Sequence, residues 1–249
     1  MSSETHKSET SAPIDPRRKI VEALMALAAE QPFEDITISD ICARAGVSLA
    51  DFRDAFPSKG AVLASLSKII DRKVLEGVND DLAAEPARDR LFDVLMRRLD
   101  AMAPYKEGLR GVSAWARRDP VSAMALNGVA LNSMRFMLEA AGIGHEGPSG
   151  TVKLQGLVLA WLRVLEVWFD DDATNDRTMA ALDRELDRGG RLVARLDDLD
   201  RLAAPLRTFA RALMQGGRDF NERVRERWQD QGRKGRDDDD GRNADRLNV

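Results

Sequence analysis

The side chains with the clearest chemical pattern lie in one short stretch that begins at Thr37. Thr37 is followed three residues later by Asp40, and Ser48 is followed three residues later by Asp51. A hydroxyl and a carboxylate at this spacing bond each other's backbone amide groups, which starts a helix. Gly46 lies between the two pairs and can end the first helix in a left-handed conformation. The pattern predicts two short helices joined by a tight turn, which is a helix-turn-helix arrangement.

Patterns for catalysis or metal binding are missing from the sequence. The chain has one cysteine, Cys42, and two histidines, His6 and His145. A structural zinc site needs more ligands of these types, and no stretch matches a nucleophile elbow or a phosphate-cradling glycine loop. We therefore expect a protein that is not an enzyme and has no cofactor or metal. A lone cysteine cannot form an internal disulfide, so Cys42 is interpreted as a small core residue and the protein as cytoplasmic.

Helices must position these residues, because the sequence has hardly any alternating apolar run that would indicate a strand. We predict an all-α fold with a small N-terminal domain and a larger C-terminal one. The helices expected in the first domain are Arg17–Glu30, Ile38–Ala45, Leu49–Phe56 and Lys59–Asn79. Those expected in the second are Arg88–Met102, Tyr105–Arg118, Val121–Ala141, Val152–Phe169 and Asn175–Leu196, with a loop at Gly142–Gly150.

The spacing of apolar residues indicates how the first domain packs. Phe52 and Phe56 lie one turn apart and are expected to face inward. The small side chains of Cys42 and Ala45 would let a neighbouring helix approach closely, together with Ile38 and Ile41 on the same face. The surface expected to receive them belongs to the first helix and is formed by Val21, Leu24 and Leu27.

From about Ile20 to Gly77 the sequence resembles the helix-turn-helix DNA-binding domain of the TetR family of transcriptional regulators. The matching residues include the capped start, the turn and the end of that family's motif. They are Thr37, Ile38, Ile41, Ala45, Gly46, Val47, Ser48, Phe56, Ser58 and Lys59.

This resemblance implies that the second helix of the pair enters the major groove and that a homodimer reads a palindromic site in double-stranded DNA. Thr37 would cap its helix and touch phosphate, while Ser48, Leu49 and Ala50 would lie nearest the base edges. Lys59, at the start of the next helix, would meet backbone phosphate. Further contacts to phosphate or the minor groove could come from Arg17, Arg18 and Lys19.

Two departures from the family pattern lie in the second helix. Arg53 and Ala55 stand where the family usually has tyrosine and then another aromatic residue or histidine, and Arg53 could bind phosphate through its charge. Asp51 and Asp54 add negative charge. A carboxylate about 6 Å from a phosphate costs under about 1 kcal/mol in a water-like dielectric, against roughly 1–3 kcal/mol for one good bidentate base contact. Asp51 also serves as a capping residue, and Asp54 could face solvent or accept a hydrogen bond from cytosine.

The second domain has bulky, adaptable apolar residues that could be core or could line a pocket for a small apolar ligand or lipid, as the resemblance implies. Glu166 interrupts an apolar helix. It could pair with Arg163 one turn earlier or be a polar anchor in the pocket. The candidate ligand-binding residues are Met96, Leu99, Met102, Trp115, Met124, Phe136, Trp161 and Glu166, and the helices Val152–Phe169 and Asn175–Leu196 are the expected dimer faces.

A second hypothesis is a lipid-binding protein that keeps the fold without reading DNA, similar to the TetR-fold proteins that support ubiquinone biosynthesis. Its grounds are the acidic second helix and a basic amphipathic stretch beyond Asp200, which could contact a membrane surface through Phe209, Leu213 and Trp228 or pack as an ordinary helix. Further grounds are the apolar segments Arg90–Tyr105 and Ser133–Gly142.

Composition and charge indicate a globular chain and are compatible with DNA binding. Hydrophobic residues make up 43% of the 249-residue chain and charged residues 32%, enough for a core beneath a charged surface. The formal net charge of −4 does not exclude DNA binding by one locally basic face. The expected organisation is a disordered leader (1–14), a helix-turn-helix domain (15–79, with the motif at about 37–56), a helical ligand-binding and dimerisation domain (80–228) and a disordered tail (229–249).

Overall fold

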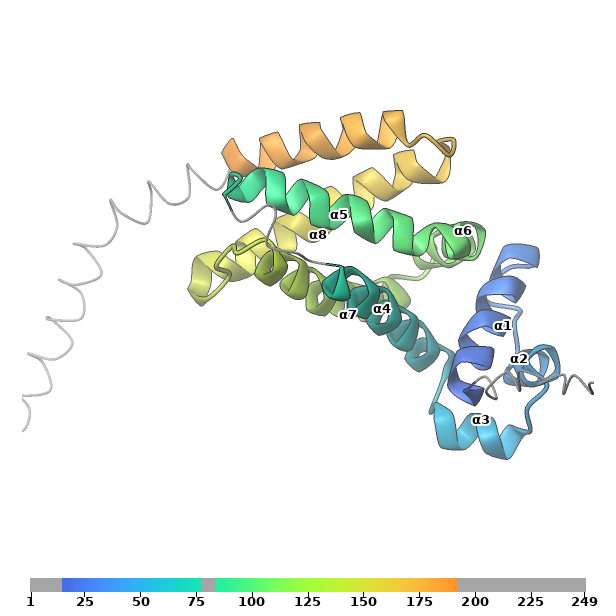
Figure 1. Ribbon diagram of the computed structural model, residues 1–249. Coiled ribbons are helices and arrows are strands. Elements are labelled where there is room, and N and C mark those ends of the chain that lie inside the picture. The colour runs from blue at the N-terminus through green and yellow to red at the C-terminus, as the bar shows by residue number, and fades with distance from the viewer. Residues whose placement is uncertain (1–14, 78–83, 192–249) are drawn as a thin grey trace, which may run out of the picture. The chain divides into compact units, whose positions relative to one another are not determined.

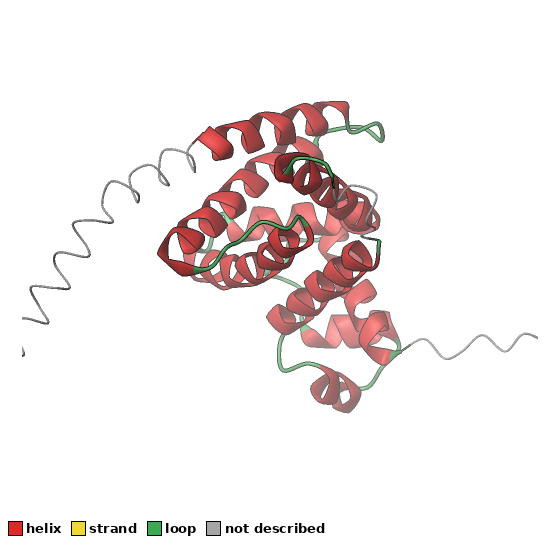
Figure 2. Cartoon of the chain, turned by 60° about the vertical axis from the view of Figure 1, so that its left-hand side comes forward, coloured by secondary structure: helices red, strands yellow, loops and turns green. Residues whose placement is uncertain are grey.

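The computed structural model describes residues 15–77 and 84–191, all of which belong to one compact unit, Met1–Val193. Within these ranges the chain forms helices and connecting loops and no strand (Figure 2). The expected all-α fold is confirmed. The predicted leader, tail and amphipathic stretch beyond Asp200 lie outside the described residues. None of the described helices combines the length and the hydropathy that a membrane-spanning segment needs.

The first three helices and the start of the fourth form a head at one end of this unit, to the lower right in Figure 1, and the rest of the fourth helix runs into the remainder of the unit. These helices are α1 (Pro16–Glu30), α2 (Ile38–Ala45), α3 (Leu49–Ala55) and α4 (Lys59–Glu76). Asp15 starts α1 by accepting a hydrogen bond from the backbone amide of Arg17 at 3.0 Å, and Pro16 occupies its first turn. Fully buried apolar side chains from these helices and from the loop between α1 and α2 form the core of the head: Ile20, Leu24, Phe33, Ile36, Ile41 and Phe52.

The remaining helices form the body. They are α5 (Ala87–Met102), the short 3-10 helix η2 (Ala103–Tyr105), α6 (Lys106–Ala116), α7 (Pro120–Ala140) and α8 (Gly147–Phe169), followed by a helix over residues 176–191. The prediction was wrong about the start of α8, which begins five residues before Val152, inside the expected loop. Pro148 explains the difference, because proline fits the first turn of a helix, where an amide has no intrahelical partner.

Two glycines of α6 bring the head and the body into backbone contact. A Cβ atom added at Gly108 would lie 2.4 Å from the carbonyl oxygen of Met25, and one added at Gly111 would lie 2.2 Å from that of Ala28. No side chain fits in so small a space. The backbone of α6 therefore packs directly on the backbone of α1, and this contact joins the head to the body.

A buried polar cluster joins three helices of the unit. Asp71 on α4 forms an ion pair with Arg98 on α5, and it accepts a hydrogen bond from the Ser133 hydroxyl on α7 at 2.6 Å. The guanidinium of Arg98 lies 5.8 Å from the ring centre of Trp161 on α8, a cation–π distance. Arg98 is only 5% exposed. The cluster therefore places two opposite charges inside the body, where each depends on the other.

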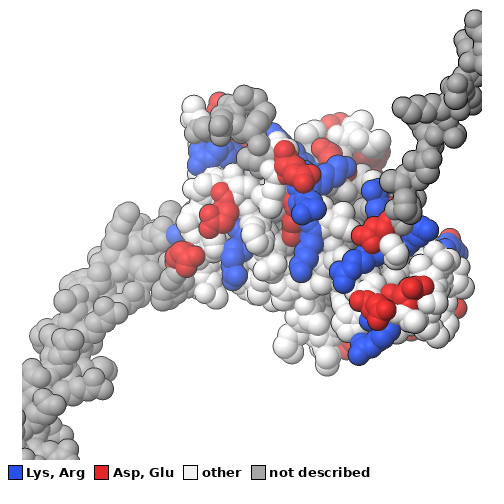
Figure 3. All heavy atoms as spheres, turned by 60° about the horizontal axis from the view of Figure 1, so that its bottom comes forward, with Lys and Arg blue, Asp and Glu red and all other residues white. Residues whose placement is uncertain are grey.

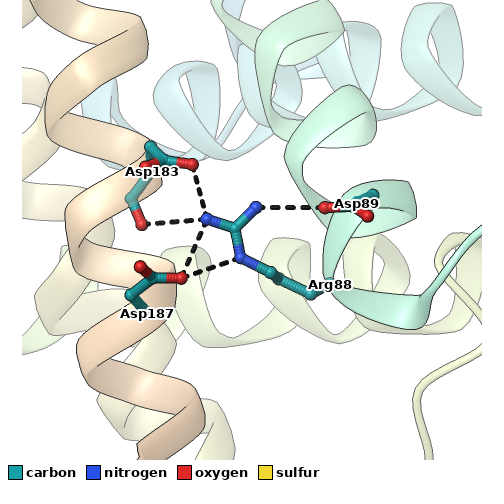
Figure 4. Close-up of polar contacts among 4 residues, drawn as sticks. All are labelled: Arg88, Asp89, Asp183 and Asp187. Atoms are coloured by element: carbon teal, nitrogen blue, oxygen red, sulfur yellow. Dashed lines mark hydrogen bonds and ion pairs between the residues drawn. The ribbon is translucent and has the colours of Figure 1, made fainter.

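An exposed ionic cluster holds the helix of residues 176–191 against α5 (Figure 4). Arg88, in the first turn of α5, donates hydrogen bonds to Asp183 at 2.5 Å and to Asp187 at 2.9 Å, and it also pairs with Asp89. The hydrogen bond to Asp183 is the main reason that the pKa of Arg88 is raised above its ordinary value. Leu182 and Leu186 on the same helix are buried.

Candidate nucleic-acid interface

A complete capping box starts α2. The backbone amide of Thr37 donates to Asp40 at 2.8 Å, and the backbone amide of Asp40 donates to the Thr37 hydroxyl oxygen at 3.1 Å. The Thr37 hydroxyl also donates to the Asp40 carboxyl at 2.6 Å, and this hydrogen bond, together with the one from the Thr37 amide, holds the pKa of that carboxyl below its usual value. Gly46 ends the helix with a φ of 65°, the left-handed conformation expected from the sequence.

A second capping box starts α3. The backbone amide of Ser48 donates to Asp51 at 2.9 Å, and the amide of Asp51 donates to the Ser48 hydroxyl at 3.1 Å. The hydrogen bond from the Ser48 hydroxyl is the first cause that lowers the pKa of Asp51. The carboxylate of Asp51 is thus occupied in starting the helix. Its negative charge remains at the helix N-terminus, where the helix dipole favours it.

One face of α3 is anchored and the other is open. Phe52 is buried in the head and packs against Phe56 with ring centres 6.3 Å apart. Leu49 is 59% exposed, which is unusual for leucine. Figure 1 shows α3 at the lower end of the molecule, beside α1 and α2. The other exposed side chains of the helix are Ala50, Asp51, Arg53 and Asp54.

Arg17 of α1 supports the end of α3. Its guanidinium donates a hydrogen bond to the carbonyl oxygen of Ala55 at 2.7 Å and lies 5.0 Å from the ring centre of Phe56. A cation at the C-terminus of a helix also interacts favourably with the helix dipole. Arg17 therefore fixes α3 on α1 and adds positive charge beside it. The neighbouring Arg18 pairs with Glu22 at 2.9 Å.

The ammonium group of Lys59 forms contacts within the head. Its Nζ donates to the carbonyl oxygens of Phe33 at 3.0 Å and Ile36 at 2.5 Å, and it lies 4.9 Å from the ring centre of Phe33. Partial burial lowers the pKa of this ammonium group. Two of the three ammonium protons are therefore donated inside the head, and the contact between Lys59 and phosphate stays a prediction.

The surface of the head is mixed in charge. In Figure 3, which turns the lower side of Figure 1 towards the viewer, basic and acidic side chains lie close to each other over the head at the right. Phosphate attraction depends on where cations lie rather than on their total number. Any DNA contact here would therefore rely on a few placed cations more than on a broad positive field.

Comparisons with known proteins agree with this geometry. Residues 20–66, which run from α1 into α4, match the family model described as bacterial regulatory proteins, tetR family. A TetR transcriptional regulator from Nitrosomonas europaea ATCC 19718 has a similar structure, with a TM-score of 0.56 and 22% identity over 72% of this chain and 99% of that chain. A TetR transcriptional regulator from Rhodococcus sp. RHA1 gives a TM-score of 0.53 and 22% identity over 70% and 95%.

The chain has the TetR fold. Residues 20–66 form its TetR-type head, and the α5–α8 body corresponds to the rest of the matched structures. A sequence search among curated proteins finds no significant match. The similarity therefore establishes the fold, and the roles of individual residues depend on their contacts within the head.

The candidate ligand-binding residues of this TetR-type body differ in how deeply they are buried. Leu99, Met102 and Trp161 are buried in the common core, and Met96 packs against it. Trp115 lies apart from them and stacks on Phe33 of the head at 4.5 Å between ring centres. The other three candidates, Met124, Phe136 and Glu166, are exposed.

The pairing expected between Arg163 and Glu166 does not form. Arg163 instead donates to Glu185 on the helix of residues 176–191 at 3.1 Å. Arg163 and Glu166 are spaced suitably for a pair on one helix. Glu185, however, is buried, and a buried carboxylate loses more free energy without a cation than the exposed Glu166 does. Arg188 also bonds Glu185, at 2.5 Å. Arg163 therefore helps to hold the last described helix on α8.

A groove lies between the TetR-type head and the body. Its volume is about 1190 Å³, and its walls come from α1, α4, η2 and the start of α6. Val21, Met25, Ile69 and Tyr105 contribute apolar or aromatic surface to it. None of the eight candidate ligand-binding residues lines this groove, and no feature of the sequence pointed to it.

Proposed function

We propose that this chain is a DNA-binding transcriptional regulator that binds a palindromic operator as a homodimer and is modulated by a small apolar ligand. The observation that carries the proposal is the orientation of α3. The Ser48–Asp51 capping box and the Arg17 contact anchor this helix at its two ends, the buried Phe52 anchors its inner face, and its outer face is left open. A short, exposed and well-anchored helix of this kind fits the major groove of B-DNA.

Arg53 is the strongest candidate for a direct DNA contact. It is exposed on the outer face of α3, and it forms no hydrogen bond or ion pair within residues 15–77 and 84–191. Its guanidinium can bond a phosphate or bind guanine O6 and N7 in bidentate fashion. Ser48, Leu49 and Ala50 would lie nearest the base edges, and Thr37 near the backbone.

Replacing Arg53 by alanine is expected to weaken specific DNA binding roughly 5- to 150-fold, the range for losing one bidentate contact. Binding of the full chain to DNA from upstream of its own coding sequence, followed by fluorescence anisotropy at several salt concentrations, measures this. Arg72→Ala is the matched control, because it removes the same charge from an exposed position towards the far end of α4. If the wild-type chain gives no specific complex, the proposed function is wrong.

The homodimer is proposed to form through α7 and α8. The two helices lie side by side, with Asn127 and Gln155 exchanging amide hydrogen bonds at 3.2 Å and 3.1 Å. Their outer surface carries most of the large exposed apolar side chains of the described ranges: Val121, Met124, Phe136, Val152, Leu159 and Leu162. An apolar surface of this kind indicates an interaction site, and two copies related by a two-fold axis would bury it in a four-helix bundle.

We expect the helix of residues 176–191, a dimer face in the sequence analysis, to contribute less to the dimer than α7 and α8. Its exposed positions are mainly charged and include Asp176, Arg177, Arg184 and Arg188. Charged residues are depleted from the centres of protein interfaces. We therefore place the centre of the dimer on α7 and α8, with the last described helix at its edge.

Replacing Leu159 by arginine is expected to convert the dimer to a monomer and to lower operator affinity, because each half-site would then be bound independently. Light scattering after size exclusion gives the mass, and anisotropy gives the affinity. Ile69→Arg on α4 is the control, since Ile69 is 40% exposed and Leu159 49%. A mass that stays dimeric in Leu159→Arg would contradict this interface.

The proposed ligand would bind in the body and change the position of the head. The buried methionines Met102, Met134 and Met137 support this, because methionine side chains adapt to ligands of different shape. The groove beside α1 and α4 is a further place where an apolar molecule would contact head and body together.

A further inference from the structure

The outer face of α3 has an unusual chemical composition for a surface that would read DNA. Leu49 and Ala50 offer only apolar contact, Arg53 offers only hydrogen-bond donors, and Asp54 offers only acceptors. Leu49 and Arg53 are four residues apart, as are Ala50 and Asp54, so each pair lies together on the helix surface and both pairs belong to its exposed half. Asp51 does not belong to this set, because its carboxylate already accepts hydrogen bonds from the amide and the hydroxyl of Ser48.

Asp54 has no other role that the structure accounts for. It is exposed, it caps no helix, and it forms no ion pair or hydrogen bond within the ranges that the structure describes. A carboxylate near the phosphate backbone repels it and lowers affinity for all DNA. The same group can still discriminate strongly between bases, because it accepts hydrogen bonds and cannot donate them.

The major groove presents a distinct pattern at each base. Cytosine N4 offers a donor, whereas guanine and thymine present acceptors to an approaching carboxylate. Adenine offers a donor at N6, but its N7 acceptor lies beside it and suits an amide side chain better. A carboxylate at the base edge therefore favours cytosine and disfavours guanine and thymine.

We propose, resting on the proposed function, that Asp54 is a specificity-determining residue that requires cytosine at one position of each operator half-site. Arg53, next to it in the chain, then contacts a guanine of the same or an adjacent base pair, and Leu49 and Ala50 contact thymine methyl groups. The operator half-site thus combines a G·C-containing step with neighbouring thymine. Asp54 lowers the affinity for all DNA, but it increases the difference in affinity between sites with cytosine and sites with another base at this position.

Selection from a library of random double-stranded DNA tests this assignment with the full-length protein. The wild-type chain is expected to enrich a palindrome with cytosine at one fixed position of each half-site. Asp54→Asn should change that position to adenine, because an amide pairs with adenine N6 and N7. Asp54→Ala should accept any base there. Binding to single synthetic sites should show a preference of roughly 5- to 150-fold for cytosine over adenine in the wild type, reversed in Asp54→Asn.

Asp35→Asn is the matched control, since it removes the same charge from an exposed position in the loop between α1 and α2. It should leave the selected sequence unchanged. If both Asp54 variants select the same sequence as the wild type, the role assigned to Asp54 is wrong and the regulator function stands. If the wild-type protein and all variants, each with an unchanged melting temperature, enrich no sequence, the regulator function fails and this assignment fails with it.

Discussion

Replacing Asp71 by alanine is expected to lower the free energy of unfolding by about 3–5 kcal/mol, the usual cost of removing one partner of a buried ion pair. The substitution leaves the guanidinium of Arg98 inside the body without a counter-charge and removes the acceptor of the Ser133 hydroxyl. Among the described residues Arg98 would keep only its cation–π contact with Trp161, since its Nε already lacks a hydrogen-bond partner. Urea denaturation followed by circular dichroism measures the loss.

Two further variants separate the buried pair from ordinary surface charge. Glu76→Ala removes an exposed carboxylate that pairs with Arg72 on the same helix, and it should change stability little. The double variant Asp71→Leu with Arg98→Met replaces both charges by apolar groups and should recover most of the loss. A loss in Asp71→Ala as small as that in Glu76→Ala would mean that Arg98 finds another partner or water.

Replacing Gly111 by alanine is expected to destabilise the protein by about 1–3 kcal/mol or more, through overpacking between α1 and α6. The new Cβ would lie 2.2 Å from the carbonyl oxygen of Ala28, and backbone atoms cannot move aside as a flexible side chain can. The head must therefore shift away from the body. We expect lower thermal stability together with weaker operator binding, measured by calorimetry and anisotropy on the same samples.

Gly128 provides the control, because the same substitution there is expected to change stability in the opposite direction. It lies within α7, and a Cβ added there meets no atom within 4 Å. Gly128→Ala should therefore keep or raise stability, because alanine is favoured over glycine inside a helix by up to about 1 kcal/mol. If both variants lost the same stability, the close contact between α6 and α1 would not be the cause.

The sequence predicted best those features whose partners lie close together in the chain. The helix-turn-helix could be located because each capping box joins residues three positions apart, and Gly46 needs no partner to adopt its turn. The boundaries of α2 were predicted to the residue. The burial of Phe52 followed from helical spacing alone.

Features that depend on distant segments could not be predicted in this way. The partners of Lys59 are carbonyls 23 and 26 residues earlier, and no local pattern marks them. Arg163 had a suitable neighbour one turn away, yet Glu185 on another helix binds it. Two features of the sequence do indicate contacts with distant segments. Arg98 lies among the apolar positions of its helix, and Gly108 and Gly111 recur at a spacing that exposes helix backbone on one face.

The two ends of α4 are attached to different parts of the molecule. Lys59 ties its first turn to the loop after α1, and Asp71 ties a later turn to α5 and α7. The two points are twelve residues apart, about 18 Å along a helix axis. A helix clamped at both points cannot absorb a rotation by bending freely between them. A tilt of α4 that begins near Asp71 would therefore reach Lys59 with little loss, so that in the proposed regulator the direction of α3 would follow small rearrangements of the interior.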